Sequence, residues 1–158
     1  MTQNLDIPNS MPMTKPLEGI PLPDLERIFD YEKGFWEGAK RHALCIQQCT
    51  DCRKLRHLPT PMCPWCHSLS YDWPEMSGKG KVYSYVTVRA PVHKALKEKG
   101  QTPYNICVVE LPEQEELRIV SNVLNIAPEE IYIEMPVNVT FKPSVDDPNI
   151  VLPLFVPA

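Results

Sequence analysis

Four of the six cysteines lie within residues 49–66 and form two Cys-x-x-Cys pairs, CTDC and CPWC. The ligand spacing is Cys49-x2-Cys52-x10-Cys63-x2-Cys66. A Cys-x-x-Cys turn can present two sulfurs to one ion, and zinc takes four thiolates tetrahedrally. The pattern therefore predicts a structural zinc ribbon, since four protein thiolates leave no position for a reactive water. A single-iron site of the rubredoxin type uses the same ligand set.

Other chemistry at the cysteines is less favoured. A thioredoxin-like redox motif fits poorly because there are two pairs and no surrounding βαβ pattern. His57 and His67 lie beside the pairs, but four cysteines already complete the ligand set. Cys45 and Cys107 sit in apolar strand patterns and are predicted to be buried thiols. The sequence has no Gly-x-Ser-x-Gly elbow, P-loop or His-Glu-x-x-His motif, so we expect no catalytic set of its own.

The elements that position the cysteines belong to a chain of 158 residues, enough for one ordinary domain or two small ones. No run approaches the roughly 18–20 apolar residues of a membrane helix, and the first residues do not read as a secretory signal. We therefore expect a cytoplasmic protein, not bound to a membrane, with reduced thiols. Residues 1–23 contain five prolines and predict an extended arm, either loose or laid across a partner.

The net charge of −4 is unevenly distributed. Residues 40–100 hold eleven basic and four acidic groups, whereas residues 101–158 hold two basic and nine acidic ones. One interpretation is an ordinary solvated surface. The other is a local site for an anion, in a protein too acidic overall to coat nucleic acid.

Residues 24–42 predict a helix with Asp24 as its N-cap. Gly34 and Gly38 weaken this prediction and can divide the segment into two helices. One face is strongly apolar, and part of it is expected to contact another chain. The apolar positions recur at roughly helical spacing: Leu25, Ile28, Phe29, Phe35, Trp36 and Ala39.

Residues 43–76 form the predicted ribbon, with short strands at 43–48 and 71–73. Residues 77–158 show period-two patterns that predict five strands, with a helical turn at 128–131 between the third and fourth. This arrangement is typical of a five-stranded OB-fold barrel. The predicted fold class is mainly β with an N-terminal helix, a zinc ribbon and an OB-fold. The five predicted strands begin near Val82, Asn105, Leu117, Val137 and Ile150, and Pro153 is expected to shorten the last one.

Several motifs together resemble the DUF35 family. They are Phe35-Trp36 in the helix, QQCTDC and LPTPMCPWC around the cysteines, GKGKVYS at 78–84, Pro103-Tyr104, Met-Pro-Val at 135–137 and the final LPLFVP. Members of this family usually have glycine where this chain has Arg53, His67 and Glu134. Glycine favours the positive φ of a metal knuckle, so these positions depart from the family pattern.

The resemblance implies a rubredoxin-like zinc ribbon fused to an OB-fold. It also implies a non-catalytic subunit of an acyl-CoA-processing complex, with structural Zn²⁺ and the coenzyme A thioester as a shared ligand. The expected partner is a thiolase-superfamily protein, as for the small accessory subunits of thiolases such as benzoylsuccinyl-CoA thiolase. An acyl-CoA hydratase or aldolase is the alternative partner. Phe35 and Trp36 are the expected interface residues.

The segment between the first two barrel strands is basic, and this part of an OB-fold commonly binds ligands. We predict that it holds the phosphates of coenzyme A, unless it is simply a solvated loop. The predicted CoA-binding residues are Arg89, Lys94, Lys97 and Lys99.

Two other functions stay open. Zinc ribbons and OB-folds also bind single-stranded nucleic acid, and Tyr83, Tyr85 and Tyr104 could stack on bases. The acidic charge of the chain opposes this interpretation. The other alternative is an acyl-CoA enzyme that acts without a partner.

Overall fold

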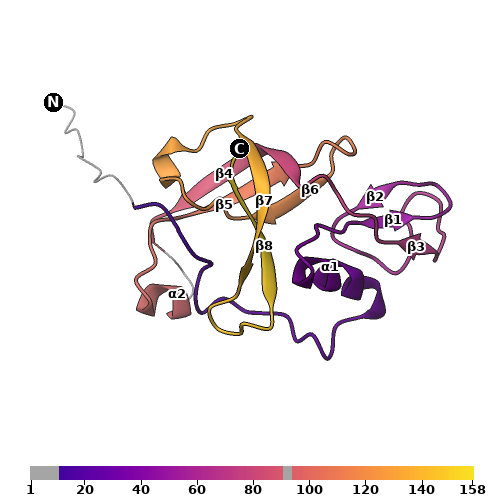
Figure 1. Cartoon of the computed structure of the whole chain (residues 1–158), viewed down its shortest axis with the longest axis horizontal. Helices are drawn as coiled ribbons and strands as arrows, with labels where there is room; N and C mark the ends of the chain where they lie inside the picture. Colours follow the sequence, from indigo (N-terminus) through magenta and orange to yellow (C-terminus); the bar gives the residue numbers. More distant parts are fainter. Residues whose placement is uncertain (1–10, 91–93) are drawn as a thin grey trace.

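The computed structural model describes residues 11–90 and 94–158, which form a small three-stranded sheet, a helix packed on it and a larger curled sheet (Figure 1). Most of the regular structure is strand, as predicted. In chain order the elements are α1 (Asp30–Lys40), β1 (Gln47–Cys49), β2 (Leu55–Arg56), β3 (Tyr71–Asp72), β4 (Lys79–Val88), α2 (Lys94–Glu98), β5 (Tyr104–Glu110), β6 (Arg118–Ser121), the 3₁₀ helix η1 (Pro128–Glu130), β7 (Pro136–Pro143) and β8 (Val151–Pro157).

Helix α1 begins at Asp30, six residues later than predicted. The side chain of Asp24 instead closes a separate turn by accepting the N–H of Glu26 at 3.1 Å. The first helical turn is fixed by Glu32, whose carboxylate accepts the N–H of Phe29 at 3.2 Å. Glu32 also donates its own N–H to the Phe29 carbonyl at 2.9 Å. These reciprocal bonds satisfy backbone groups that a helix start otherwise leaves unpaired.

The two glycines in α1 do not divide the helix; they let it approach the ribbon closely. A Cβ on Gly34 would lie 2.2 Å from the ring of Trp73. A Cβ on Gly38 would lie 2.8 Å from the Sγ of Cys45. Both distances are far inside van der Waals contact, so only glycine permits this packing.

The ribbon sheet has the strand order β2-β1-β3, and both pairings are antiparallel. Its strands are only two or three residues long, and the predicted strand at 43–48 is shorter than expected and shifted to Gln47–Cys49. An isolated bridge between Cys45 and Glu75 continues the pairing toward the larger sheet. Strands this short carry little stability of their own.

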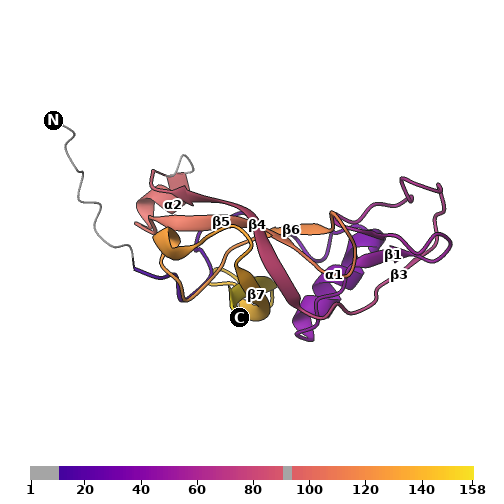
Figure 2. The ribbon, with the colours of Figure 1, turned by 90° about the horizontal axis from the view of Figure 1, so that it is seen from above.

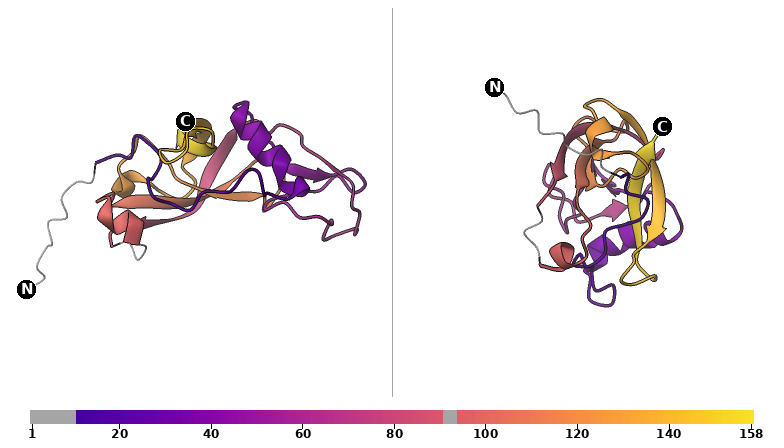
Figure 3. Two further views of the ribbon diagram at one scale, coloured as in Figure 1. Left: turned by 90° about the horizontal axis from the view of Figure 1, so that it is seen from below. Right: turned by 90° about the vertical axis from the view of Figure 1, so that its left-hand side faces the viewer.

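The larger sheet has the order β6-β5-β4-β7-β8, with antiparallel neighbours throughout. It curls strongly, as the end-on view in Figure 3 shows. A parallel bridge between Val123 and Phe155 joins its two outer edges. Hydrogen bonds from Leu124 N–H to the Phe155 carbonyl (2.7 Å) and from Phe155 N–H to the Asn122 carbonyl (3.0 Å) support that contact. With η1 between β6 and β7, this architecture is consistent with the predicted OB-fold.

Two features of the strands were not predicted from the sequence. The register of β4 shifts between Val82 and Ser84, and the alternation breaks there: Val82 is buried, whereas Val86 is 52% exposed. A bulge adds one unpaired residue and turns later side chains to the other face. Pro153 does not shorten β8, because it lies inside the strand, opposite Phe141.

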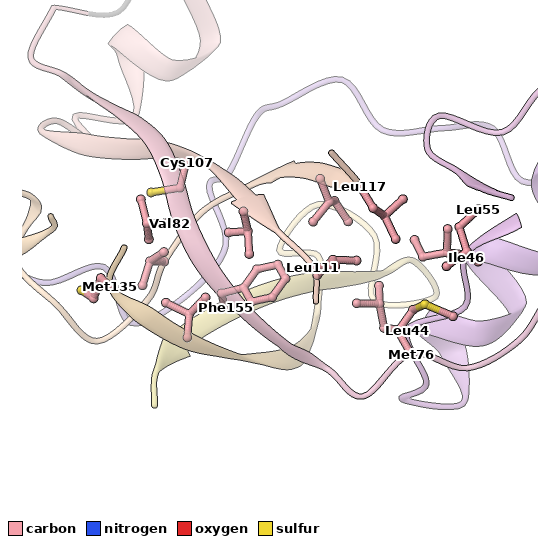
Figure 4. Close-up of a cluster of buried hydrophobic side chains, with 14 of the residues drawn as sticks. Leu44, Ile46, Leu55, Met76, Val82, Cys107, Leu111, Leu117, Met135 and Phe155 are labelled. Carbon is pink, nitrogen blue, oxygen red and sulfur yellow. The ribbon is translucent and has the colours of Figure 1, made fainter. Parts of the chain in front are cut away.

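One hydrophobic core joins the ribbon to the OB-fold (Figure 4). Leu44, Ile46 and Leu55 of the ribbon face Leu111 and Leu117 of the larger sheet. The two modules therefore bury apolar area against each other, which is the main source of stabilisation between them.

Residues 11–23 lie along the chain's own OB-fold, running from the side of α2 toward α1 (Figures 1 and 2). Leu17 is buried with Leu96 and Tyr104. Residues 11–23 of the predicted arm contain no helix or strand and pack on this chain, rather than lying loose or across a partner. Residues 1–10 fall outside the described residues. None of the helices in the described part of the chain is long and apolar enough to cross a membrane.

Candidate functional site

The four predicted metal ligands converge at one point of the ribbon. The Sγ atoms of Cys49, Cys52, Cys63 and Cys66 all lie within 4.8 Å of one another. Cys49 Sγ is 3.5 Å from Cys66 Sγ, and Cys52 Sγ is 3.6 Å from Cys63 Sγ. Four sulfurs about 2.3 Å from a tetrahedral zinc stand about 3.8 Å apart, whereas a disulfide needs about 2.05 Å. The donor set therefore fits a structural zinc ion.

Each Cys-x-x-Cys pair forms the same backbone turn. The residue after each second cysteine donates its N–H to the carbonyl of the first cysteine. Arg53 donates to Cys49 and His67 to Cys63, both at 3.0 Å. Arg53 has φ 60° and His67 has φ 59°, in the left-handed region. These are the positions where glycine is typical, so the turn geometry is kept although the residue type is not.

Backbone N–H groups lower the pKa of the ligand thiols, whereas desolvation and neighbouring sulfurs raise it. The N–H of Cys52, with that of Asp51, lowers the pKa of Cys49 to about 6. Although the Ser68 N–H favours its thiolate, partial desolvation of the sulfur and the neighbouring sulfurs of Cys49, Cys52 and Cys63 raise the pKa of Cys66 to about 12. Four adjacent thiols cannot all ionise without a compensating charge. A divalent cation supplies that charge, which is why metal binding is coupled to thiol deprotonation.

Polar side chains hold the ribbon in place around this centre. The amide of Gln114, from the β5–β6 turn, accepts the Leu55 N–H at 2.8 Å and donates to the Leu55 carbonyl at 2.9 Å. It thereby pairs with the edge of β2 as another strand would. Inside the ribbon, the buried Gln47 accepts the Thr60 N–H at 2.9 Å. These contacts fix the loop that carries the second cysteine pair.

His57 lies beside the centre but is not one of the converging ligands. Its ring packs 5.2 Å from the ring of Phe35. Burial lowers the pKa of His57 to about 4, so the imidazole is neutral near pH 7. In the described part of the chain, the side chains that converge as possible metal ligands are the four cysteines and do not include His57.

The two predicted interface residues occupy different environments. Phe35 is buried in the shared core and contacts Trp36 edge-on at 5.2 Å. Trp36 is only partly buried and lines a shallow cavity with Leu25, Ile28 and Val151. The Phe35 ring serves the chain's own packing, and the interface role of both residues stays a prediction.

The described side chains of the predicted CoA-binding residues each lie beside a carboxylate. Arg89 Nη2 lies 2.9 Å from a carboxylate oxygen of Glu129. Lys99 pairs with Glu18 of the arm, and this contact raises the pKa of Lys99. The side chain of Lys94 is 87% exposed, and its Nζ lies 3.7 Å from a carboxylate oxygen of Glu98.

The side chain of Lys97 lies outside the described residues, although its backbone belongs to α2. Each described basic residue of this segment thus has a carboxylate neighbour that an incoming phosphate would have to replace. Binding of coenzyme A here remains a prediction.

The remaining thiols and tyrosines offer little exposed chemistry. Burial raises the pKa of Cys107 to about 11 and also raises that of Cys45, so both are neutral thiols. Tyr104 is buried beneath the arm. The Arg118 guanidinium lies 3.6 Å from the centre of the Tyr83 ring, and both Tyr83 and Tyr85 are partly exposed.

Sequence reasoning missed the residues that join distant segments. Gln114 docks the ribbon, and Gln101 holds the arm through two hydrogen bonds with Glu18. Both side chains act across more than fifty residues of sequence, and no local pattern marks them. A cavity of about 500 Å³ between the arm and Gly100–Pro103 was not foreseen either.

Two adjacent segments of the chain match the models of known protein families. Residues 36–72 match the rubredoxin-like zinc ribbon domain of ChsH2. Residues 73–142 match the C-terminal OB-fold domain of ChsH2. The boundary between them falls at Trp73, just after β3.

Three individual proteins extend these matches. A probable enoyl-CoA hydratase alpha subunit from Thermomonospora curvata is 41% identical over 145 residues, or 91% of this chain and 42% of that protein. The chain therefore spans less than half the length of that relative. A DUF35 domain-containing scaffold protein from Methanocaldococcus jannaschii is 33% identical, over 71% of this chain and 77% of that protein. A solved structure, the Ltp2-ChsH2(DUF35) aldolase, has a chain that is 40% identical with a TM-score of 0.72, covering 83% of this chain and 97% of that one.

Proposed function

Because the chain belongs to the DUF35 family, we propose that it is an accessory subunit of an enzyme complex that processes acyl-CoA thioesters. The match that carries this proposal is the DUF35 chain of the Ltp2-ChsH2 aldolase, which is covered almost completely. The hydratase subunit points to the same substrate class. These names favour a hydratase or an aldolase as the partner, while the thiolase predicted from sequence remains to be tested.

The site chemistry supports a scaffold role for this chain. The four ligand cysteines form a closed set that leaves no open metal position. The two other thiols are buried and neutral, so neither is an activated nucleophile. Catalysis in the complex is therefore assigned to the partner.

Purification of the tagged chain from its native cells tests this proposal. We expect one stoichiometric partner, identified by mass spectrometry. The complex should hydrate, cleave or thiolyse an acyl-CoA, whereas the chain alone should do none of these. Turnover by the isolated chain would contradict the accessory role. A thiolase partner would support the original prediction against the hydratase or aldolase alternative.

The CoA-binding part of the proposal has its own test. In the complex, the triple change of Arg89, Lys94 and Lys97 to Ala should weaken CoA binding by about tenfold, because each exposed charge pair contributes less than about 1 kcal/mol. Lys142→Ala, an exposed lysine on β7, is the matched control. Unchanged CoA affinity in the triple variant would remove the basic segment from the site.

A further inference from the structure

The cavity beneath the N-terminal arm is large enough to bind a small molecule. It measures about 500 Å³ and lies between residues 11–17 and the segment Gly100–Pro103, with Arg89 beside it. This size falls within the roughly 300–1,000 Å³ of pockets that bind small molecules. The arm forms one wall, so the site exists only while the arm stays in place.

The arm is attached at two points. Within the cavity lining, the carbonyl of Met13 accepts the N–H of Asn125 at 2.7 Å. After it, the side-chain amide of Gln101 accepts the Glu18 N–H at 2.7 Å and donates to the Glu18 carbonyl at 2.8 Å. The Lys99–Glu18 ion pair lies at the same end. The span between these anchors is therefore held over the cavity rather than resting there loosely.

The lining of the cavity combines an apolar surface with two cations. The arm contributes methionines, prolines and Leu17, and the opposite wall contributes Pro103. Lys15 and Arg89 are the charged residues of the lining. Arg89 is paired with Glu129 at 2.9 Å, so an anionic ligand group would replace or share that carboxylate partner. This combination suits a ligand with an apolar chain joined to an anionic group.

We propose that the cavity holds the acyl chain of a coenzyme A thioester, with Lys15 and Arg89 facing the anionic part of the ligand. This inference rests on the proposed function, because the substrate class comes from there. Arg89 connects the cavity with the predicted CoA-binding segment, because it lines the cavity and is the first residue of that segment. The arm thereby becomes part of the binding site and not only a cover for the sheet.

Calorimetric titration of the full chain with CoA, octanoyl-CoA and free octanoate tests the proposal. Each buried methylene raises affinity about fourfold, so burial of a few carbons should make octanoyl-CoA bind at least about tenfold more tightly than CoA. Octanoate, which lacks the nucleotide, should bind more weakly than octanoyl-CoA. Equal affinities for CoA and octanoyl-CoA would overturn the cavity proposal while leaving the CoA role intact. Absence of binding by both would also overturn the cavity proposal, while the CoA role is decided separately by the triple variant in the complex.

A pair of variants locates the effect. Thr14→Trp places a large ring in the exposed part of the arm that lines the cavity and should abolish the gain from the acyl chain. Lys142→Trp places the same ring on β7, away from the cavity lining, and should preserve it. If the Thr14→Trp variant still binds octanoyl-CoA more tightly than CoA by the same factor, the proposal is overturned.

A photoreactive acyl-CoA gives a second measurement on the unaltered chain, which decides the matter even if the tryptophan variant fails to fold. The label should appear in residues 11–17 or 100–103. Labelling elsewhere would overturn the proposal.

Discussion

Replacement of His67 by glycine should stabilise the metal-bound protein, and replacement by alanine should not. His67 is exposed and has φ 59° in the turn that closes the second cysteine pair. Its N–H donates to the Cys63 carbonyl at 3.0 Å, and both variants keep that bond. The two substitutions remove the same imidazole and differ only in whether a Cβ remains, so their comparison isolates backbone strain.

The expected magnitude follows from two opposing effects. The left-handed conformation costs a residue with a Cβ about 1–2 kcal/mol. Glycine avoids this cost but loses about 0.5–1 kcal/mol more conformational entropy on folding than alanine. The net gain for His67→Gly is therefore about 0.5–1 kcal/mol. His67→Ala keeps the strain and should stay within about 0.5 kcal/mol of the wild type.

Urea unfolding at a fixed free zinc concentration measures this difference, because metal binding contributes to the free energy of unfolding. The affinity for zinc should rise by about two- to fivefold in His67→Gly, which is the same free energy expressed as a binding constant. Ser70→Gly, at an exposed position without positive φ, should instead lose about 0.5–1 kcal/mol. The reasoning is refuted if the glycine and alanine variants at His67 are equally stable, or if glycine is the less stable of the two.

Three further predictions concern the ribbon. Removal of the metal by a chelator, or Cys63→Ser, should abolish stoichiometric zinc binding and unfold the ribbon, as metal analysis and circular dichroism would record; retained ribbon structure in the metal-free chain would contradict this. Burial lowers the pKa of His57 from about 6.5 to about 4. Between these pH values His57 is protonated in the unfolded state and neutral in the native state. The free energy of unfolding therefore falls as the pH decreases below about 6.5. Between pH 7.5 and pH 5 this contribution amounts to about 2 kcal/mol, and His57→Gln should remove it from the pH dependence of urea unfolding; an unchanged slope would exclude the assignment. Gln114→Ala should cost about 1–3 kcal/mol in the same assay by leaving the Leu55 N–H and carbonyl unpaired, whereas the exposed neighbour Glu115→Ala should be nearly neutral.

The metal site could be predicted because its information is local. Two residues between cysteines define a turn, and sulfur chemistry defines what that turn binds, so Cys49 through Cys66 needed no tertiary knowledge. The OB strands were predictable for a similar reason, since alternation along a strand records which face is buried. The bulge between Val82 and Ser84 could not be predicted in this way, because it shifts the register without leaving a pattern in the sequence.

The start of α1 shows a different limit. Asp24 is a good capping residue and does form a capped turn, but it does not begin the helix. The helix begins beyond Phe29, which has no capping side chain, and depends on Glu32 instead. Capping preferences rank candidate starts, and tertiary packing of the apolar face decides among them. Here the contacts of Gly34 and Gly38 with the ribbon fix where the helix must lie.

The zinc ion is expected to support more than the ribbon that binds it. The ribbon strands have two or three residues each, so the ribbon sheet cannot bury a core by itself. Its apolar residues Leu44, Ile46 and Leu55 instead belong to the core of the OB-fold. Loss of the metal would release these side chains and expose Leu111 and Leu117 to water. The metal, although remote from the arm and its cavity, therefore stabilises the body on which the proposed acyl-CoA site is built.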